Sequence, residues 1–235
     1  MTAKELNIIM IAHRGYSGKY FHNTELAFTK AAEHGSQGAE TDIRMTKDGV
    51  LVCSHNREAG LKDGSELIVR DSTYEELTAQ PLKNPLTDDD VYLCTFRRYL
   101  EIMKENNMIC FVELKDAFTD GQIIEVFEMV KEVYDIDKCL LQSFEFDNLV
   151  RVHSFFPELK IMLTYGASER NYERCFEYGF SLDVDVNVVT DEMIKAFHER
   201  GLEVAVWTCN TEETLERGKK LGVEYIESDV FGGND

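Results

Sequence analysis

The sequence predicts an α/β fold of the (β/α)8 TIM-type barrel class. Strand-like and helical segments alternate along the 235 residues, and this alternation implies a parallel sheet with helices in its connections. Eight strands in a chain of this length favour a closed barrel over an open, doubly wound sheet. No G-x-G-x-x-G follows a candidate strand, so the commonest sequence signature of the open sheet is absent. The eight candidate strands span 7–13, 38–43, 109–115, 139–143, 160–164, 181–185, 203–208 and 223–228.

A recurring sequence pattern supports these elements: a helix ends at a glycine, and an apolar strand follows after a short gap. Glycine readily adopts the left-handed backbone of a helix C-cap, so each glycine marks a helix end. Thr190 is the expected N-cap of the helix that follows it, and Asn23 is the expected N-cap of the first helix. The C-cap glycines are Gly35, Gly179, Gly201 and Gly222.

Residues 50–55 interrupt the alternation. They follow the second strand after a very short connection, whereas a parallel crossover needs a dozen residues or more. The run must therefore form a hairpin with the second strand. A two-residue turn at Asp48 and Gly49 would place His55 opposite Asp42.

We expect one domain over residues 1–235, with an insertion at about 56–107 between this hairpin and the third barrel strand. The insertion contains a helix start at 71–77, a polar loop at 84–90 and a helix near 95–105. On the active face of a barrel, such an insertion usually shapes the substrate pocket.

Composition bounds the cellular setting. Apolar residues make up 43% of the chain, but no run is long and uncharged enough to predict a membrane span. Residues 1–6 lack the apolar stretch and cleavage site of a signal peptide. The six cysteines are scattered without a CxxC motif. We therefore expect buried, reduced thiols and a cytoplasmic location.

The formal net charge of −19 also bounds the partners. A negative field of this size repels nucleic acid and anionic membrane surfaces, so neither is expected as a partner. An anionic substrate would need positive charge placed locally at its site.

Three carboxylates fall at or near the ends of predicted strands. Glu40 and Asp42 occupy positions i and i+2 of one strand and point to the same face, where a cation best relieves their repulsion. In the third strand, Glu113 shares the inward face with Phe111 and Lys115. Three inward carboxylates without thiolates favour Ca²⁺ or Mg²⁺.

Two histidines accompany these carboxylates. His13 and His55 are candidates for a general acid–base pair, and Arg14 and Lys115 could supply the positive field that a phosphate requires. The alternatives are that the histidines are structural and that Arg14 braces the first loop. His22 lies close to the same segment, and its role stays open.

Two aromatic residues follow predicted strands at the same face. Trp207 ends the run 204–207, and Phe144 follows the run 140–143. Both could form an apolar wall for a small alcohol; packing in the core is the alternative.

These residues closely resemble the motifs of the glycerophosphodiester phosphodiesterase family, in order and over nearly the whole chain. The first motif corresponds to I-A-H-R-G at 11–15 followed by N-T at 23–24, and the second to G-x-E-x-D-x-x-x-T-x-D-G-x-x-V-x-H at 38–55. The later motifs correspond to E-L-K at 113–115, S-F at 143–144, V-W-T-C-N at 206–210 and G-V-E-Y-I-E-S-D at 222–229.

The resemblance implies a barrel that releases glycerol 3-phosphate and an alcohol from a small-molecule glycerophosphodiester. It implies a divalent metal on Glu40, Asp42 and Glu113, with His13 and His55 as acid–base catalysts.

Two departures from the family pattern bear on the substrate head group: His22 stands where the family has a glutamate, and Asn56 where it has an aspartate. Two alternative functions remain. One is a phospholipase-like barrel that forms a cyclic phosphate, for which an exposed apolar docking loop would be expected and none is evident. The other is a barrel that binds a phosphodiester without cleaving it.

Overall fold

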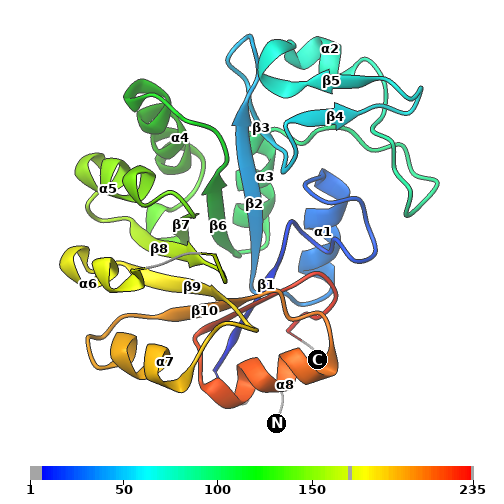
Figure 1. Ribbon diagram of the computed structural model, residues 1–235. Coiled ribbons are helices and arrows are strands. Elements are labelled where there is room, and N and C mark those ends of the chain that lie inside the picture. The colour runs from blue at the N-terminus through cyan, green and yellow to red at the C-terminus, as the bar shows by residue number, and fades with distance from the viewer. Residues whose placement is uncertain (1–6, 169–170, 234–235) are drawn as a thin grey trace.

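Eight parallel strands close into a barrel in the computed structural model, which describes residues 7–168 and 171–233. The ring runs in the order β1-β11-β10-β9-β8-β7-β6-β2, and it closes because β1 pairs with both β11 and β2 (Figure 1). Each predicted strand overlaps one of these eight, and β2 and β8 extend beyond their predicted ends, so the predicted barrel is confirmed. The strands are β1 (Ile9–Ala12), β2 (Gly38–Met45), β6 (Ile109–Leu114), β7 (Cys139–Ser143), β8 (Lys160–Tyr165), β9 (Ser181–Asp185), β10 (Val204–Trp207) and β11 (Tyr225–Ser228).

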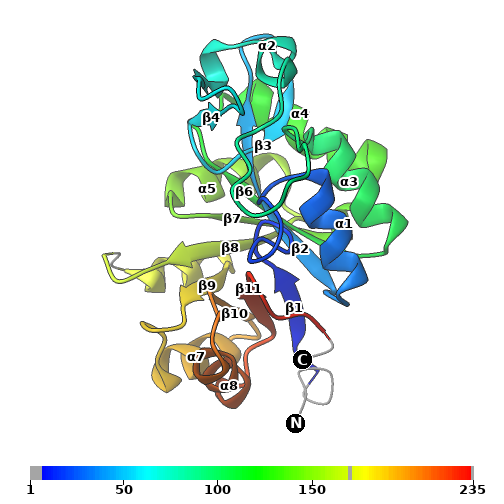
Figure 2. The ribbon, with the colours of Figure 1, turned by 90° about the vertical axis from the view of Figure 1, so that its right-hand side faces the viewer.

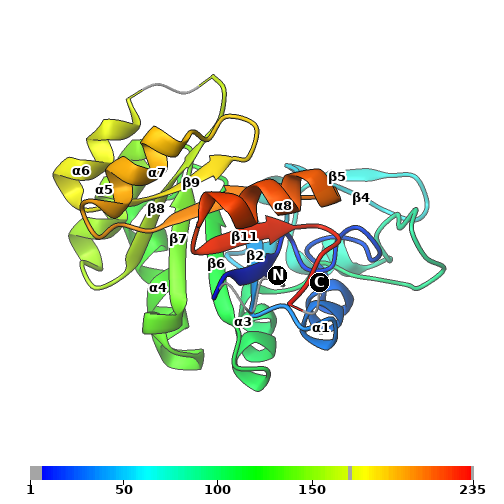
Figure 3. The ribbon, with the colours of Figure 1, turned by 90° about the horizontal axis from the view of Figure 1, so that it is seen from below.

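Helices cover the outside of the barrel, as the view from below in Figure 3 shows. Their apolar faces pack on the outward side chains of the strands and form the large core between the two layers. The helices are α1 (Glu25–Glu33), α3 (Phe96–Glu105), α4 (Asp120–Val133), α5 (Phe146–Phe155), α6 (Cys175–Tyr178), α7 (Asp191–His198) and α8 (Glu212–Leu221).

A smaller apolar layer fills the inside of the barrel. Six strands contribute inward side chains that are at most 4% exposed, and the rings of Phe111 and Tyr225 meet edge to face at 5.2 Å. This layer closes the barrel below the site, because no space for water remains among well-packed side chains. Its buried members are Ile11, Phe111, Leu140, Met162, Ala205 and Tyr225.

The helix ends follow the predicted chemistry in part. Gly179 and Gly222 are left-handed C-caps. Gly35 and Gly201 are also left-handed (φ 87° and 70°), but they lie just beyond the C-caps, which are His34 and Glu199. The Thr190 hydroxyl accepts from the amide of Met193 at the start of α7. The predicted Asn23 cap is wrong. Thr24 caps α1 instead, because Asn23 has a left-handed backbone (φ 57°) that turns its amide toward the barrel.

The hairpin is present, but its predicted register is wrong by one residue. Strand β3 (Leu51–Cys53) pairs antiparallel with β2, and the amide of Ser54, rather than that of His55, donates to the Asp42 carbonyl at 2.8 Å. The turn has three residues instead of two: Thr46 pairs with Val50, and Gly49 takes a left-handed conformation (φ 85°). A type I turn followed by such a residue is the usual three-residue hairpin loop.

The insertion projects beyond β2 and β3, at the top of Figure 2, except for its last helix, α3, which lies beside α1 and α4 in the outer layer of the barrel. It contains the two predicted helices, α2 (Tyr74–Thr78) with a capping box at Thr73, and α3 with its N-cap at Thr95. It also contains an antiparallel pair that the sequence did not predict, β4 (Glu58–Gly60) and β5 (Glu66–Ile68), followed by a 3₁₀ turn, η2 (Val69–Asp71). These strands have three residues each, too short to give an alternating pattern.

All six cysteines are buried free thiols, as expected. In the described part of the chain, no helix is both long and apolar enough to cross a membrane.

Candidate active site

A polar layer lies directly above the apolar floor of the barrel. Side chains two positions apart on a strand share a face, so each strand that places an apolar residue in the floor places its next inward residue in this upper layer. The six pairs are Ile11 and His13, Phe111 and Glu113, Leu140 and Gln142, Met162 and Thr164, Ala205 and Trp207, and Tyr225 and Glu227.

A cavity of about 240 Å³ opens in this layer. Seven of the nine predicted site residues line it: His13, Arg14, His55, Glu113, Lys115, Phe144 and Trp207. The other two, Glu40 and Asp42, are 1% and 0% exposed and lie directly behind the lining residues. Glu40 accepts from the Arg14 amide, and Asp42 pairs with Lys115, which also pairs with Glu113. The structure thus brings all nine residues together.

Glu40, Asp42 and Glu113 form a compact carboxylate cluster. The strand register places Glu40 beside Phe111 and Asp42 beside Glu113, and one oxygen of each of the three carboxylates lies within 4.8 Å of the others. All three are buried, and Asp42 Oδ1 has the Lys115 ammonium as an ion-pair partner but accepts no hydrogen bond of good geometry. Hard oxygen donors at this spacing fit a divalent cation such as Ca²⁺ or Mg²⁺.

Two cations already face this cluster. The Lys115 ammonium lies 3.1 Å from Asp42 Oδ1 and 2.9 Å from Glu113 Oε2, and Arg14 Nε lies 3.2 Å from Asp42 Oδ2. Burial raises the pKa of Asp42, but Lys115 and Arg14 outweigh it and hold that pKa below its ordinary value. The pKa of Glu40 is raised well above its ordinary value by burial and by the Asp42 charge, and burial also raises the pKa of Glu113.

The first loop orients the cluster through two residues with left-handed backbones. Arg14 (φ 59°) points its amide at Glu40 Oε2, at 3.0 Å. Asn23 donates from Nδ2 to Asp42 Oδ2 at 2.8 Å and accepts from the Thr41 hydroxyl. Asn23 is a site residue that the sequence analysis placed in a cap instead. The adjacent Thr24 also belongs to the residue types that cap helices, so residue type alone did not decide between the two positions.

His13 is held by a network from the end of β11. Its Nδ1 lies 2.7 Å from Asp229 Oδ1, which also accepts from the Ser17 hydroxyl at 2.7 Å, and Asn210 donates to the other Asp229 oxygen. Burial raises the pKa of Asp229, but the hydrogen bonds from His13 and Ser17 prevail and lower it to about 2. An ionised Asp229 fixes a proton on Nδ1 of His13 and leaves Nε2 available.

His55 has a different partner. Its Nδ1 lies 3.0 Å from Asn56 Oδ1, a neutral amide oxygen. Its backbone carbonyl accepts from the buried Arg44, which is also paired with Asp116. Burial is the main cause that lowers the pKa of His55 from its ordinary value.

The aromatic residues flank the cavity. Phe144 and Trp207 meet edge to face with ring centroids 5.8 Å apart, and the Lys115 ammonium lies 6.0 Å from the Phe144 ring centre. His22 lines a neighbouring cavity rather than this one and stacks on Phe21 at 4.6 Å. Burial lowers the pKa of His22 to about 4.

Two further buried acids, Asp183 and Glu227, line the cavity and were not predicted as site residues. Both are at most 1% exposed, and Glu227 Oε1 accepts no hydrogen bond. Burial raises the pKa of each well above its ordinary value; neighbouring carboxylates add to the effect. The two-residue spacing from the floor residue Tyr225 would have placed Glu227 in the polar layer.

The sequence and the fold match known proteins over nearly the whole chain. A sequence profile of the Glycerophosphoryl diester phosphodiesterase family matches residues 13–232. A glycerophosphodiester phosphodiesterase of Bacillus altitudinis is 27% identical over 229 residues, 94% of each chain. One of Caldanaerobacter subterraneus is 28% identical over 232 residues, 95% of each chain.

Solved structures show the same barrel. A phosphodiesterase of Oleispira antarctica in complex with the product sn-glycerol-3-phosphate superposes with a TM-score of 0.84 at 20% identity, over 100% of this chain and 97% of that one. A glycerophosphodiester phosphodiesterase of Thermotoga maritima gives a TM-score of 0.77 at 28% identity, over 94% of each chain.

Proposed function

The chain belongs to the glycerophosphoryl diester phosphodiesterase family, and on that basis we propose that it hydrolyses glycerophosphodiesters to sn-glycerol 3-phosphate and an alcohol, with a divalent metal and two catalytic histidines. The observation that carries this proposal is one cavity at which both imidazoles meet a carboxylate cluster. Related enzymes from Bacillus and Caldanaerobacter are named for this activity, and the Oleispira protein binds this product.

An excess of buried negative charge supports the metal. Five carboxyl groups, of Glu40, Asp42, Glu113, Asp183 and Glu227, surround the permanent positive charges of Arg14 and Lys115. Carboxylates confined at such density must be protonated or bind a cation. Glu40, Asp42 and Glu113 would hold the ion, and when bound it would neutralise charge that develops on the phosphate oxygens.

The protein's own groups supply the remaining chemistry. Arg14 and Lys115 face the cavity and would attract the phosphate by charge and hydrogen bonding. His13 and His55 each engage Nδ1 in a hydrogen bond within the protein, so each has Nε2 for proton transfer. One imidazole would take a proton from the attacking oxygen, and the other would give a proton to the leaving alkoxide. If the attacking oxygen is a glycerol hydroxyl of the substrate, water then opens the resulting cyclic phosphate to the monoester.

Two neighbouring features complete the proposal. Phe144 and Trp207 would form the apolar wall against which the carbon atoms of the substrate pack. We assign the activity to one catalytic domain over residues 1–235 and to the cytoplasm, where six free thiols stay reduced.

The test is an assay of purified protein on glycerophosphocholine, glycerophosphoethanolamine and glycerophosphoglycerol, with EDTA, Ca²⁺ or Mg²⁺. We expect turnover that EDTA abolishes, and a loss of about 10²-fold or more in His13→Ala and in His55→Ala. His198→Ala is the matched control, because His198 lies away from the cavity, where its Nε2 is 3.2 Å from Glu224 Oε2.

The products decide between the alternatives. Phosphorus NMR should show free glycerol phosphate, whereas a cyclic phosphate as the final product would identify the phospholipase-like reaction. Binding of a diester without any turnover would instead favour the non-catalytic barrel.

A further inference from the structure

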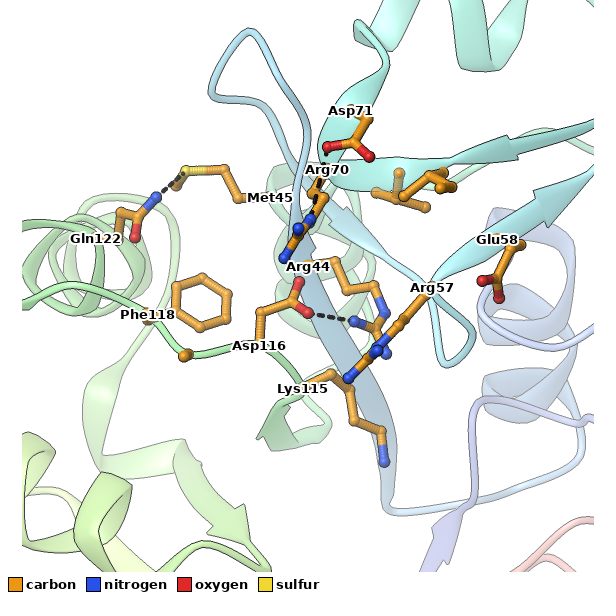
Figure 4. A pocket seen from close by; sticks show the side chains of 13 residues that line it. Arg44, Met45, Arg57, Glu58, Arg70, Asp71, Lys115, Asp116, Phe118 and Gln122 are labelled. Carbon is orange, nitrogen blue, oxygen red and sulfur yellow. Dashed lines mark hydrogen bonds and ion pairs between the residues drawn. The ribbon is translucent and has the colours of Figure 1, made fainter.

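A second, larger cavity adjoins the site. It has a volume of about 480 Å³ and lies between the insertion and the loop that connects β6 to α4 (Figure 4). Four cationic side chains line it: Arg44, Arg57, Arg70 and Lys115. Three acidic residues, Glu58, Asp71 and Asp116, also line it. In a chain with a net charge of −19, this concentration of arginines is unusual and calls for an explanation.

The four cations differ in how far they are already neutralised. Arg44 is 6% exposed and is committed to Asp116 and to the His55 carbonyl. Lys115 is committed to Asp42 and Glu113. The two remaining arginines therefore carry the uncommitted charge of the cavity.

Arg57 and Arg70 are both exposed. Over residues 7–168 and 171–233, no carboxylate lies within ion-pairing distance of Arg57. Arg70 has one long contact, 3.6 Å from Nε to Asp71 Oδ1, between two largely exposed side chains. An exposed pair of this kind is worth little, so both guanidinium groups remain available to a ligand.

The backbone holds these two arginines together. The Val69 amide donates to the Arg57 carbonyl at 2.9 Å, which ties η2 to the start of β4. The β4–β5 ladder extends this pairing, with Glu58 opposite Ile68. Figure 4 shows the Arg57 side chain directed toward the Arg44–Asp116 pair. The unpredicted two-stranded segment of the insertion thus positions both cations.

The cavity is also continuous with the proposed catalytic groups. Lys115 lines both this cavity and the smaller one. Arg57 follows His55 by two residues, and Arg44 binds the His55 carbonyl. A phosphodiester bound at Lys115 would therefore have one of its two alcohol groups directed into this larger space.

The two cavities differ in charge. In the smaller one, Arg14 and Lys115 already face Asp42 and Glu113, and the acids Asp183 and Glu227 lie beside them, so it suits the uncharged glycerol hydroxyls better than a second anion. The larger one presents uncommitted guanidinium groups, which bind phosphate through charge-assisted and bidentate hydrogen bonds.

We propose that the larger cavity receives the alcohol half of the diester and that Arg57 and Arg70 select alcohols that carry a second phosphate group. This inference rests on the proposed function, because it assigns a substrate class to the same site. It also gives a role to the segment after Asn56, where the chain departs from its family pattern.

The test compares two substrates that differ by one phosphate, glycerophosphoinositol and glycerophosphoinositol 4-phosphate. We expect a higher kcat/KM for the phosphorylated substrate. The ratio of the two values should fall about 5- to 10-fold in Arg57→Gln/Arg70→Gln, since each exposed pair contributes a few-fold. The ratio should also fall as salt is added, because screening weakens exposed charge pairs.

Two variants control for charge and folding. Arg97→Gln removes the same charge from the outer surface of α3, where Arg97 pairs with Glu132, and should leave the ratio unchanged. Arg57→Lys keeps the charge without the planar fork and should retain part of the preference.

Other outcomes separate the two proposals. Equal kcat/KM for both substrates, or an unchanged ratio in the double variant, would overturn the cationic subsite while leaving the phosphodiesterase intact. Absence of turnover on every diester would overturn the proposed function itself.

Discussion

At the residue scale, the two imidazoles of the cavity differ in the charge of their partners. Asp229 presents a carboxylate to Nδ1 of His13, whereas Asn56 presents a neutral amide oxygen to Nδ1 of His55. The carboxylate of Asp229 and the amide of Asn56 each hold one imidazole by Nδ1, so the two members of the proposed acid–base pair differ in the charge of the group that orients them.

Asn56→Asp should remove this asymmetry. Burial now holds the pKa of His55 below its ordinary value. A carboxylate at about 3 Å should raise the pKa of His55 by about 1 or more. The His55 C2 proton, assigned by its loss in His55→Ala, should titrate at higher pH in an NMR titration with EDTA present. Asn106→Asp adds the same charge at the exposed end of α3 and should leave the signal unmoved. An unchanged His55 titration in Asn56→Asp would show that the contact does not control its charge.

The residue types of the site could be read from the sequence, but some of their partners could not. The i, i+2 spacing placed Glu40 and Asp42 on one face. The same rule extends to Glu227, two residues after the inward Tyr225, but an isolated strand does not show which of its faces points into the barrel. Asn23 could not be separated from Thr24 as a cap by propensity alone, since both residue types cap well. Only the left-handed backbone at Asn23 decides between them.

At the element scale, the β2–β3 hairpin sets the position of His55. Its turn has Gly49 at φ 85°, a conformation that strains any residue with a Cβ. The register depends on this three-residue loop, and the choice between two and three residues is not encoded in the Asp48-Gly49 pair, which suits both turns. The sequence therefore predicted the hairpin but not its register.

Gly49→Ala should destabilise the protein through backbone strain alone. A Cβ at this glycine would meet no atom within 4 Å, so no clash contributes. We expect a loss of about 1 kcal/mol, measured as a fall in Tm of about 2–4 °C for a chain of this size. The matched control is Gly121→Ala in the first turn of α4, where space is equally open and φ is ordinary. Its Tm should stay the same or rise. An equal fall in both variants would point to a cause other than φ.

At the scale of the whole molecule, the barrel separates packing from chemistry into two inner layers. The apolar floor of Ile11, Phe111 and their neighbours excludes water, and the polar layer above it concentrates carboxyl groups. The alternation of helices and strands predicted this architecture, because each glycine-to-strand pattern marks one unit of the barrel. Which side chains of the polar layer become neighbours could not be predicted from the sequence. Their arrangement depends on the strand registers, and these are set by contacts between distant segments.

The concentrated carboxyl groups should make stability depend on pH and metal together. The pKa values of Glu40, Glu113, Asp183 and Glu227 are raised in the folded protein, mainly by burial. A carboxyl group of this kind contributes stability that is complete below its unfolded pKa of about 4 and is lost as the pH rises through its folded pKa. Asp229, with its pKa lowered to about 2, acts in the opposite sense, and its contribution is lost only as the pH falls below about 4.

His22 and His55 act in the opposite sense over this range, because burial lowers their pKa values, but the four carboxyl groups outnumber them. Without metal, Tm should therefore be higher at about pH 5.5 than at about pH 8. A divalent cation binds the ionised carboxylates and competes with protons, so Ca²⁺ or Mg²⁺ should raise Tm more at the higher pH. Thermal unfolding with EDTA and with each ion, at both pH values, measures this coupling.

Added salt distinguishes the effect of the buried carboxyl groups from the repulsion between surface charges in a chain with a net charge of −19. Screening weakens interactions between exposed charges more than interactions between buried ones. Glu227→Gln should flatten the pH dependence in EDTA, and Glu113→Gln should also weaken the response to metal. A metal response of equal size at both pH values would mean that the ion binds outside the buried carboxylates.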